Sequence, residues 1–387
     1  MNHSKVYLDY AATTPVDPAV AAAMLPYFDQ AFGNPSSIHY FGQQAEAAVE
    51  SARETTAGIL GCKPKEIIFT SGGTESDNLA LRGAALAARK SRQADKILIS
   101  PVEHHAVSKT AAQLAEVFGF ELEYLPVDRA GMVHPDEVAK RLDRRAAVVS
   151  VIYANNEIGT VNPIAEIGAI CQAHGIPFHT DAVQAGAYLP LEAQRLNADL
   201  ISLGAHKFYG PKGVGALYVR QGTPILPMNT GGSQEMGLRA GTHNVAYIVG
   251  FARALEIAQA ERQARAQSLL PLRNRLIGAI LEEIPDSQLT GHADQRLPNH
   301  ASFVFKQIDG NMLLAMLDIA GYACSSGSAC KTGSPEPSDV LTALGIAPEW
   351  ALGSLRVTLG KGTTPEHISG FIAALKAQIA TLRKSGS

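Results

Sequence analysis

Cysteine is scarce in this sequence, and long apolar runs and an excess of one charge sign are missing. Its four cysteines, at positions 62, 171, 324 and 330, include no CxxC pair, which favours a reducing compartment over a disulfide framework. We therefore expect no metal site. The longest apolar stretch, around residues 146–154, is far shorter than the roughly 20 residues of a membrane span. A net charge of −3 without a basic block makes nucleic acid and anionic membranes unexpected partners.

No targeting segment is visible either. Residues 1–5 lead directly into the strand-like Val6-Tyr7-Leu8, so we expect no signal or transit peptide and a cytoplasmic location. With 387 residues, 46% of them hydrophobic and 18% charged, the chain can bury a large core. Composition thus predicts a globular enzyme or binding protein.

Apolar strand-like runs alternate with helical patterns over the first two thirds of the chain. This alternation predicts an α/β fold with a mostly parallel sheet covered by helices on both faces, in which ligands gather at the carboxyl ends of the strands. The expected strands are residues 66–70, 96–100, 121–126, 147–153, 177–179, 200–203 and 215–219. The expected helices include residues 74–90, 107–118, 135–141 and 163–174.

After about residue 245 the pattern changes. One long helical stretch, residues 246–281, contains Pro271, which we expect to break or kink it. Short strands and further helices follow, expected at residues 302–305, 310–320, 354–358 and 365–383. We predict a large domain of residues 15–258 and a smaller α+β domain made of residues 1–14 with 259–387.

Lys207 follows the apolar segment 199–203 and precedes a Gly/Pro-rich turn. Burial lowers the pKa of a lysine and makes its amine available for Schiff-base chemistry. A lone lysine in a turn is usually a surface residue. Asp181, at the end of the preceding strand, changes this interpretation because its carboxylate could keep a pyridinium nitrogen protonated. The two residues together predict pyridoxal phosphate (PLP) as the cofactor.

A glycine-rich turn, Ser71-Gly72-Gly73-Thr74, links the strand 66–70 to a helix. Glycines let the backbone approach an anion, and a helix start favours negative charge. The simpler alternative is an ordinary turn with Thr74 as the N-cap. Given Lys207 and Asp181, we favour a phosphate site that includes Gly73, Thr74 and His206.

Three polar side chains follow other strands. His104 could stack on an aromatic cofactor, although spacing does not decide between it and His105. Asn156 and Gln184 could bond cofactor or substrate oxygens, and turn chemistry alone also explains Asn156.

Arg356 is a charge inside an expected strand, where it would either form a structural ion pair or grip a substrate carboxylate. The turn residue Asn34 could assist it. Cys330 lies in the small, polar loop 324–338 beside Lys331, which favours an exposed, nucleophilic thiolate. Cys324 is either a small core residue or a thiol that relays sulfur.

In this order, these segments resemble the cysteine desulfurases, PLP enzymes of the class V aminotransferase group, along essentially the whole chain. The motifs that carry the resemblance are Leu8-Asp9-Tyr10-Ala11-Ala12-Thr13-Thr14-Pro15, Gly33-Asn34-Pro35-Ser36-Ser37, Thr70-Ser71-Gly72-Gly73-Thr74-Glu75-Ser76-Asp77-Asn78, Glu103-His104, Asn155-Asn156-Glu157-Ile158-Gly159, His206-Lys207, Arg239-Ala240-Gly241-Thr242 and residues 325–338. The loop around Cys330 is similar to the subgroup that feeds iron–sulfur assembly scaffolds. The resemblance implies the PLP-dependent transferase fold of type I, with a seven-stranded sheet.

The resemblance also implies roles for single residues. Those toward the cofactor are Lys207 as the Schiff-base lysine that moves the Cα proton, Asp181 at the ring nitrogen, His104 on the ring, Gln184 and Asn156 at the ring oxygen and substrate edge, and Thr74 and His206 at the phosphate. Thr242 would reach the phosphate of a neighbouring subunit, which implies a homodimer with shared active sites. Arg356 with Asn34 would bind the substrate carboxylate.

The reaction implied is the removal of sulfur from L-cysteine as a persulfide on Cys330, with release of L-alanine and supply of sulfur to an iron–sulfur scaffold or another acceptor protein. Three alternatives stay open: an aminotransferase, which would not need Cys330; a selenocysteine lyase, which would share every residue; and a non-catalytic protein that has kept the fold. One departure is Gly204, where many relatives carry a serine that contacts phosphate.

Overall fold

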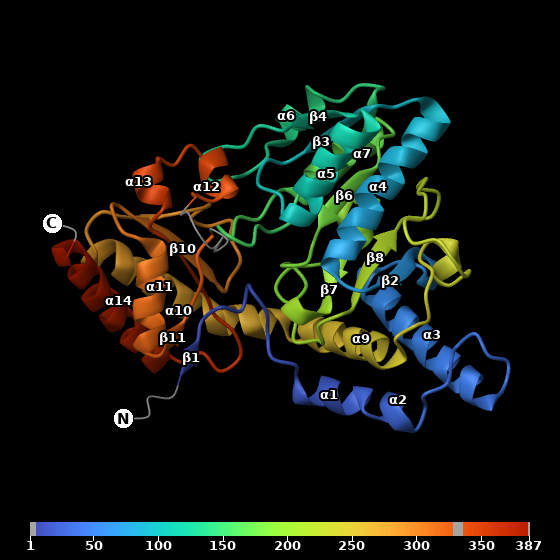
Figure 1. Ribbon diagram of the computed structural model, residues 1–387, viewed down its shortest axis with the longest axis horizontal. Helices are drawn as coiled ribbons and strands as arrows, with labels where there is room; N and C mark the ends of the chain where they lie inside the picture. Colours follow the sequence, from blue (N-terminus) through green and yellow to red (C-terminus); the bar gives the residue numbers. More distant parts are fainter. Residues whose placement is uncertain (1–4, 328–335, 386–387) are drawn as a thin grey trace.

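A seven-stranded sheet forms the centre of the protein, whose computed structural model describes residues 5–327 and 336–385 (Figure 1). Within these residues the strands lie in the order β2-β8-β7-β6-β5-β3-β4. Their bounds are β2 (Ile67–Thr70), β3 (Lys96–Ile99), β4 (Glu121–Tyr124), β5 (Ala146–Ser150), β6 (Phe178–Asp181), β7 (Leu200–Gly204) and β8 (Gly215–Val219). Strand β8 runs opposite to the other six strands of this sheet, so the predicted α/β fold with a mostly parallel sheet is confirmed.

Helices cover both faces of this sheet because its inner strands, such as β5, β7 and β8, are buried at every position. In β3, Ile97 and Ile99 belong to one hydrophobic cluster and Leu98 to another, as expected when successive side chains point to opposite faces. The first cluster includes α4 (Gly73–Arg92) and α5 (His105–Phe118). The second includes α3 (Tyr40–Leu60), α7 (Ile164–Ala173) and α9 (Val245–Ala260). Short helices α1 (Pro18–Met24), α2 (Pro26–Asp29), α6 (Pro135–Ala139) and α8 (Ala193–Leu196) complete this part.

A smaller antiparallel sheet, in the order β12-β10-β9 within the described residues, forms the core of the other end of the molecule (Figure 1). Its strands are β9 (Ser287–Leu289), β10 (His300–Phe305) and β12 (Ser354–Thr358). The helices there are α10 (Arg262–Glu283), α11 (Gly310–Ile319), α12 (Asp339–Ala343), α13 (Pro348–Ala351) and α14 (Pro365–Ser385). The first strand, β1 (Val6–Tyr7), pairs in parallel with β11 (Tyr322–Ala323), so the N-terminal segment packs with the C-terminal third.

The expected break at Pro271 is wrong. The helix ends and restarts at Glu261, which is both the C-cap of α9 and the N-cap of α10, whereas α10 continues through Pro271. Proline removes the hydrogen bond to the carbonyl four residues earlier, here that of Gln267. Both Gln267 and Pro271 are exposed, so solvent can satisfy that carbonyl and the helix tolerates the loss. No helix within the described residues has the length and apolar character needed to cross a membrane.

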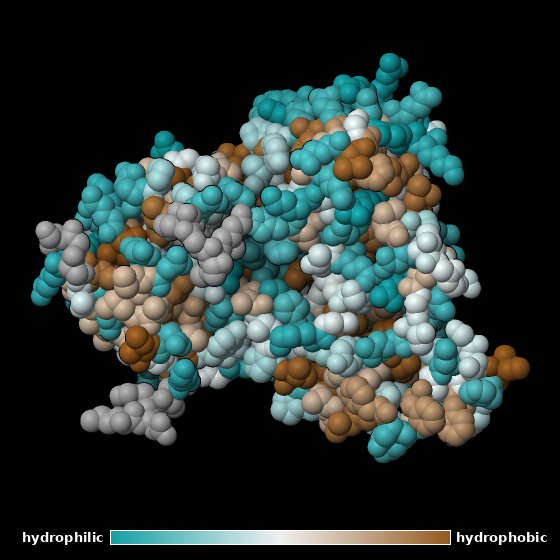
Figure 2. Space-filling view, in the orientation of Figure 1, coloured by the Kyte–Doolittle hydropathy of each residue, from teal (hydrophilic) through white to brown (hydrophobic). Residues whose placement is uncertain are grey.

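Exposed apolar side chains gather around α1, α2 and the start of α3. Figure 2 shows this area as brown spheres at the lower right of the molecule, where Figure 1 places these helices. We call it the α1–α3 patch; its most exposed members are Leu25 (64%), Phe28 (56%), Phe32 (64%), Ile38 (92%) and Tyr40 (65%). Phe32 stacks on Phe41 with ring centroids 5.6 Å apart, so part of the patch is an ordered aromatic cluster. A patch of this kind usually marks an interface.

Candidate active site

A cavity of about 570 Å³ lies where β6 and β7 end, within the size range of small-molecule sites. It brings together most of the residues that the sequence predicted. Its lining includes Gly73, Thr74, His104, Asn156, Asp181, Gln184, His206, Lys207 and Arg356. These residues come from both ends of the molecule, because Arg356 belongs to β12 and the others to the large sheet and its connections.

Lys207 sits in a single 3₁₀ turn, Ala205–Lys207, directly after β7. Its Nζ donates hydrogen bonds to the carbonyl oxygens of Ala11 (2.6 Å) and Ala12 (2.8 Å), so the N-terminal segment fixes the position of the amine. Burial, with a contribution from the positive charge of Arg356, lowers the pKa of Lys207 to about 8. The neutral amine is therefore accessible near physiological pH, as Schiff-base and proton-transfer chemistry require.

Asp181 ends β6 and is buried, with 4% of its surface exposed. Its Oδ1 accepts a hydrogen bond from the backbone N–H of Val183 at 2.9 Å. Burial and the negative charge of Asp77 raise the pKa of Asp181 to about 7. A cation placed against this carboxylate would stabilise its ionised form, so this part of the cavity is suited to a protonated ring nitrogen.

The start of α4 forms another wall of the cavity. Gly73 is its first residue, and a Cβ there would lie only 2.6 Å from Cγ2 of Val183, so glycine is needed for this close approach. The first N–H groups of a helix have no intrahelical partners and favour an anion. Burial and the charges of Lys207 and Lys212 lower the pKa of His206 to about 4, so His206 serves as a neutral hydrogen-bonding group.

Lys212 also lines the cavity, although sequence reasoning missed it. The sequence feature that could have identified Lys212 is its place in the Gly/Pro-rich turn that follows Lys207. Together with the start of α4, it makes this region suited to phosphate.

His104 is the N-cap of α5, where its Nδ1 accepts a hydrogen bond from the N–H of Ala106 at 3.1 Å. In the neutral ring the proton is therefore on Nε2. The ring is exposed because it borders the open cavity, while the protein around its other sides lowers the pKa of the imidazole by burial. His105 does not line this cavity, so the structure favours His104 as the residue that meets a ligand.

Arg356 lies in the middle of β12 and is 8% exposed. Its guanidinium donates to the carbonyl oxygen of Asn156 at 3.0 Å and to Oδ1 of Asp9 at 2.9 Å. Oδ2 of Asp9 accepts from the hydroxyl of Ser325 at 2.8 Å. An arginine at the cavity wall with one carboxylate already bound has the chemistry to bind a second, incoming one.

Gln184, another residue of the cavity wall, donates from Nε2 to the carbonyl of Ala11 at 2.9 Å.

Two predicted residues lie outside this cavity. Asn34 is exposed, and its Oδ1 accepts from the N–H of Ser36 at 3.0 Å. Thr242 is exposed on the loop before α9. Cys330 lies outside the described residues. Burial raises the pKa of the thiols of Cys62, Cys171 and Cys324 to about 12, which keeps them protonated and favours a packing role for all three.

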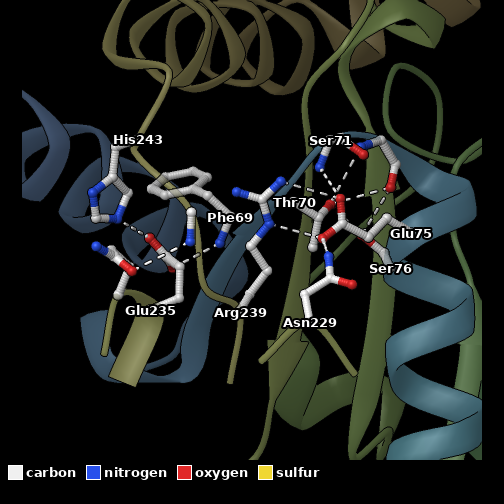
Figure 3. Close-up of polar contacts among 12 residues, drawn as sticks. Phe69, Thr70, Ser71, Glu75, Ser76, Asn229, Glu235, Arg239 and His243 are labelled. Carbon is white, nitrogen blue, oxygen red and sulfur yellow. Dashed lines mark hydrogen bonds and ion pairs between the residues drawn. The ribbon is translucent and has the colours of Figure 1, made fainter. Parts of the chain in front are cut away.

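Two polar networks hold the segment before Thr242 against the start of α4 and against β2 (Figure 3). In one, Glu75 accepts from the N–H of Ser71 at 2.7 Å, from Arg239 at 2.8 Å and from Asn229 at 3.0 Å.

In the other network, Glu235 accepts from Arg53 at 2.7 Å, from the N–H of Phe69 at 2.8 Å and from His243 at 2.7 Å. Burial opposes ionisation of Glu235, but hydrogen bonds from Arg53 and His243 outweigh it and lower its pKa to about 2. Together, the two networks anchor the loop that carries Thr242 to the start of α4 through Arg239 and Glu75, and to β2 through His243 and Glu235.

Comparisons with known proteins agree with this geometry. The family model described as aminotransferase class-V matches residues 6–371. The cysteine desulfurase IscS of Dictyoglomus turgidum is 48% identical over 98% of this chain and 95% of its own length, and that of Methanosarcina thermophila is 48% identical over 98% and 93%. A solved structure of a NifS-like protein superposes with a TM-score of 0.90 at 36% identity, covering 98% of this chain and all of the other. The structure of SspA in complex with cysteine superposes with a TM-score of 0.78 at 35% identity, covering 92% of this chain and 99% of the other.

Proposed function

The chain belongs to the class-V aminotransferase family and, within it, to the cysteine desulfurases, and from this we propose that it removes sulfur from L-cysteine and releases L-alanine. The observation that carries the proposal is one cavity in which Lys207 with a lowered pKa, the buried carboxylate of Asp181 and the guanidinium of Arg356 meet. These groups can respectively move a proton, hold a cation and bind a carboxylate.

The cavity suits PLP on three counts: its volume, the close approach allowed by Gly73, and a buried carboxylate at Asp181 in need of a cation. We propose that Gly73, Thr74 and His206 hold the phosphate, assisted by Lys212. Asp181 would hold the protonated ring nitrogen, with His104 against the ring and Gln184 and Asn156 at the ring oxygen and substrate edge. When bound, PLP supplies an electron sink for negative charge that develops at the substrate Cα.

Lys207 has the proton-moving role in this proposal. Its amine can take the proton from the substrate Cα and return a proton later, because a pKa of about 8 makes both forms accessible. The hydrogen bonds from Nζ to the carbonyls of Ala11 and Ala12 keep the amine at the cavity.

Arg356 would bind the substrate carboxylate through its planar, bidentate guanidinium. Asn156 supports this position, since its carbonyl accepts from Arg356. We propose that Asn34 assists in the assembled protein.

Cys330 is the proposed nucleophile. Its thiolate would attack the substrate sulfur, so that an S–S bond forms and the C–S bond breaks. The electron pair of the C–S bond stays with the carbon skeleton, which takes up a proton and leaves as alanine. The persulfide on Cys330 then passes its sulfur to an acceptor, for which we propose an iron–sulfur assembly scaffold in the cytoplasm.

We further propose a homodimer with shared active sites. The α1–α3 patch supplies an apolar surface of the kind that a second subunit would cover. Thr242 is exposed on an anchored loop outside its own cavity, which supports a role at the phosphate of the other subunit.

Mass spectrometry of the intact protein after exposure to L-cysteine tests the proposed function. We expect one added sulfur atom on the wild-type protein, its loss on reduction, and its absence from Cys330→Ser. A Cys330→Ser protein that still forms alanine and sulfide at the wild-type rate would rule out the proposed nucleophile, and equal transamination of alanine with 2-oxoacids would favour an aminotransferase.

A further inference from the structure

Asp77 is a buried carboxylate in the cavity wall that the proposed reaction does not use. It lies in the second turn of α4, lines the cavity and is 1% exposed. Its Oδ1 has no hydrogen-bond partner among the described residues. Burying a carboxylate oxygen without a partner is costly. A ligand that brought a positive charge to this wall would reduce that cost.

Asp77 lies next to the groups proposed to hold the cofactor ring. A carboxylate oxygen of Asp77, one of Asp181 and a ring nitrogen of His104 all lie within 4.8 Å of one another. Burial raises the pKa of Asp77 to about 7, and the charge of Asp77 in turn raises the pKa of Asp181. A cation beside Asp181 would stabilise both carboxylates at once.

A rigid polar support lies on the other side of Asp77. His179 of β6 is hydrogen-bonded to Ser150 of β5 at 2.9 Å and to Ser202 of β7 at 3.0 Å. Its Nε2 is 3.5 Å from Oδ1 of Asp77, and the side chain of Ser202 lowers the pKa of Asp77, although burial outweighs this effect. The carboxylate therefore lies beside a polar cluster built on three adjacent strands of the sheet.

Among the residues that the structure describes, no titratable group next to Asp77 itself supplies a fixed positive charge. Burial lowers the pKa of His179 to about 4 and also lowers that of His104, so both rings are neutral near pH 7. Glu103 is another buried acid, whose pKa burial raises well above its usual value. Lys207 interacts with Asp181, but its amine is the group that would react with PLP, so negative charge at Asp77 and Asp181 would then need a cation on the ligand.

We propose that Asp77 is a positioning residue that acts through Asp181: it adds a second negative charge near the ring nitrogen of PLP and keeps that nitrogen protonated, while His179, held by Ser150 and Ser202, lies beside its carboxylate. The inference rests on the proposed function and deepens it, since the proposed reaction by itself assigns no role to Asp77. A purely structural Asp77 would instead be neutral and replaceable by asparagine without effect on the ring.

The test uses holoprotein reconstituted with PLP labelled with ¹⁵N in the ring, whose ¹⁵N chemical shift reports protonation of that nitrogen. In Asp77→Asn we expect the nitrogen to lose its proton at a pH lower by about one unit or more, in line with removal of a nearby charge. We also expect the Kd of PLP to rise about tenfold. The matched control is Asp318→Asn, which removes an equal charge from a side chain that is 61% exposed, and should titrate like wild type.

An identical ¹⁵N titration in Asp77→Asn and wild type would overturn the inference. Should Asp77→Asn fail to fold, infrared difference spectra of ¹³C-aspartate-labelled wild-type protein decide. A carboxylate band that appears on PLP binding at pH 7, and that is lost or shifted in Ser202→Ala, supports the role of Asp77. A carboxyl group that stays protonated on PLP binding contradicts it. A wild-type protein that binds no PLP would refute the proposed function instead, so the two failures are distinguishable.

Discussion

Asp9 and Arg356, 347 positions apart in the sequence, form an ion pair of 2.9 Å at the wall of the cavity. Arg356 also donates to the carbonyl of Asn156, which leaves its Nε buried without a partner among the described residues. The guanidinium is thus oriented before any substrate arrives. Such preorganisation reduces the conformational entropy lost on binding a carboxylate.

Arg356→Lys should weaken substrate binding because an ammonium cannot offer the planar pair of donors that a carboxylate fits. We expect the KM for L-cysteine to rise about tenfold to a hundredfold, which corresponds to about 1.5–3 kcal/mol for hydrogen bonds to a charged group. Steady-state kinetics check this. The absorbance of bound PLP should be unchanged, and a variant with normal KM would exclude Arg356 as the carboxylate-binding residue.

Asp9→Asn provides the complementary measurement. Asparagine keeps one acceptor oxygen for Arg356 but removes the competing negative charge, so we expect the KM for L-cysteine to fall rather than rise. A higher KM in this variant would mean that Asp9 acts mainly by orienting the guanidinium.

Reconstitution of the apoprotein with PLP should depend on pH through Lys207. Its pKa is lowered to about 8, and only the free amine attacks the aldehyde of PLP. We expect the rate to increase about tenfold per pH unit well below pH 8 and to level off above it. Stopped-flow absorbance measures this rate; Lys212→Arg keeps the neighbouring charge and should show the same midpoint, whereas Lys207→Ala should show no covalent attachment.

Gly73, which lines the cavity, and Gly204, which lies behind it, should respond in opposite directions to added side chains. At Gly73 a Cβ would lie 2.6 Å from Cγ2 of Val183, so Gly73→Ala should weaken PLP binding more than tenfold. At Gly204 the backbone is extended, with φ −137°, and a Cβ would lie 3.3 Å from the N of Gly73. Gly204→Ser therefore places a hydroxyl near the proposed phosphate site and should tighten PLP binding several-fold. Fluorescence titration of the apoproteins with PLP compares the affinity of wild type, Gly73→Ala and Gly204→Ser. Weaker PLP binding by Gly204→Ser than by wild type would show that the added atoms displace the start of α4.

Glu235→Gln should destabilise the protein, since it leaves the buried guanidinium of Arg53 without its partner. We expect a loss of about 3 kcal/mol or more in the free energy of unfolding. The folded-state pKa of Glu235 is depressed to about 2, so this stabilisation is complete above the unfolded pKa near 4.5 and is lost as pH falls towards 2. Urea unfolding at pH 7 and pH 3 should show a smaller difference between the two proteins at the lower pH. An exposed pair, broken by Glu256→Gln, serves as control and should change stability little.

Much of the fold could be predicted from the sequence, because β5, β7 and β8 are buried on both sides and so appear as continuous apolar runs. The end of α9 could not, since Glu261 carries no break signal, whereas Pro271 does and is tolerated at an exposed position. Lys207 and Asp181 were predictable because Asp181 ends β6 and Lys207 lies in the short turn directly after β7. The contacts of Arg356 with Asp9 and of Asp77 with His179 were not, since they depend on tertiary packing between distant segments. The role of Cys330 came from the composition of its loop and from resemblance, and stays a prediction.

The N-terminal segment makes the proposed active site sensitive to changes near the start of the chain. Val6 and Tyr7 pair with β11, Asp9 binds both Arg356 and Ser325, and the carbonyls of Ala11 and Ala12 hold Lys207. A short ribbon remote in sequence from every proposed catalytic residue therefore bridges the two ends of the molecule at the place where the chemistry occurs. We therefore expect substitutions or insertions that displace residues 5–12 to lower the turnover of the enzyme, even though these residues lie far in sequence from the proposed catalytic ones.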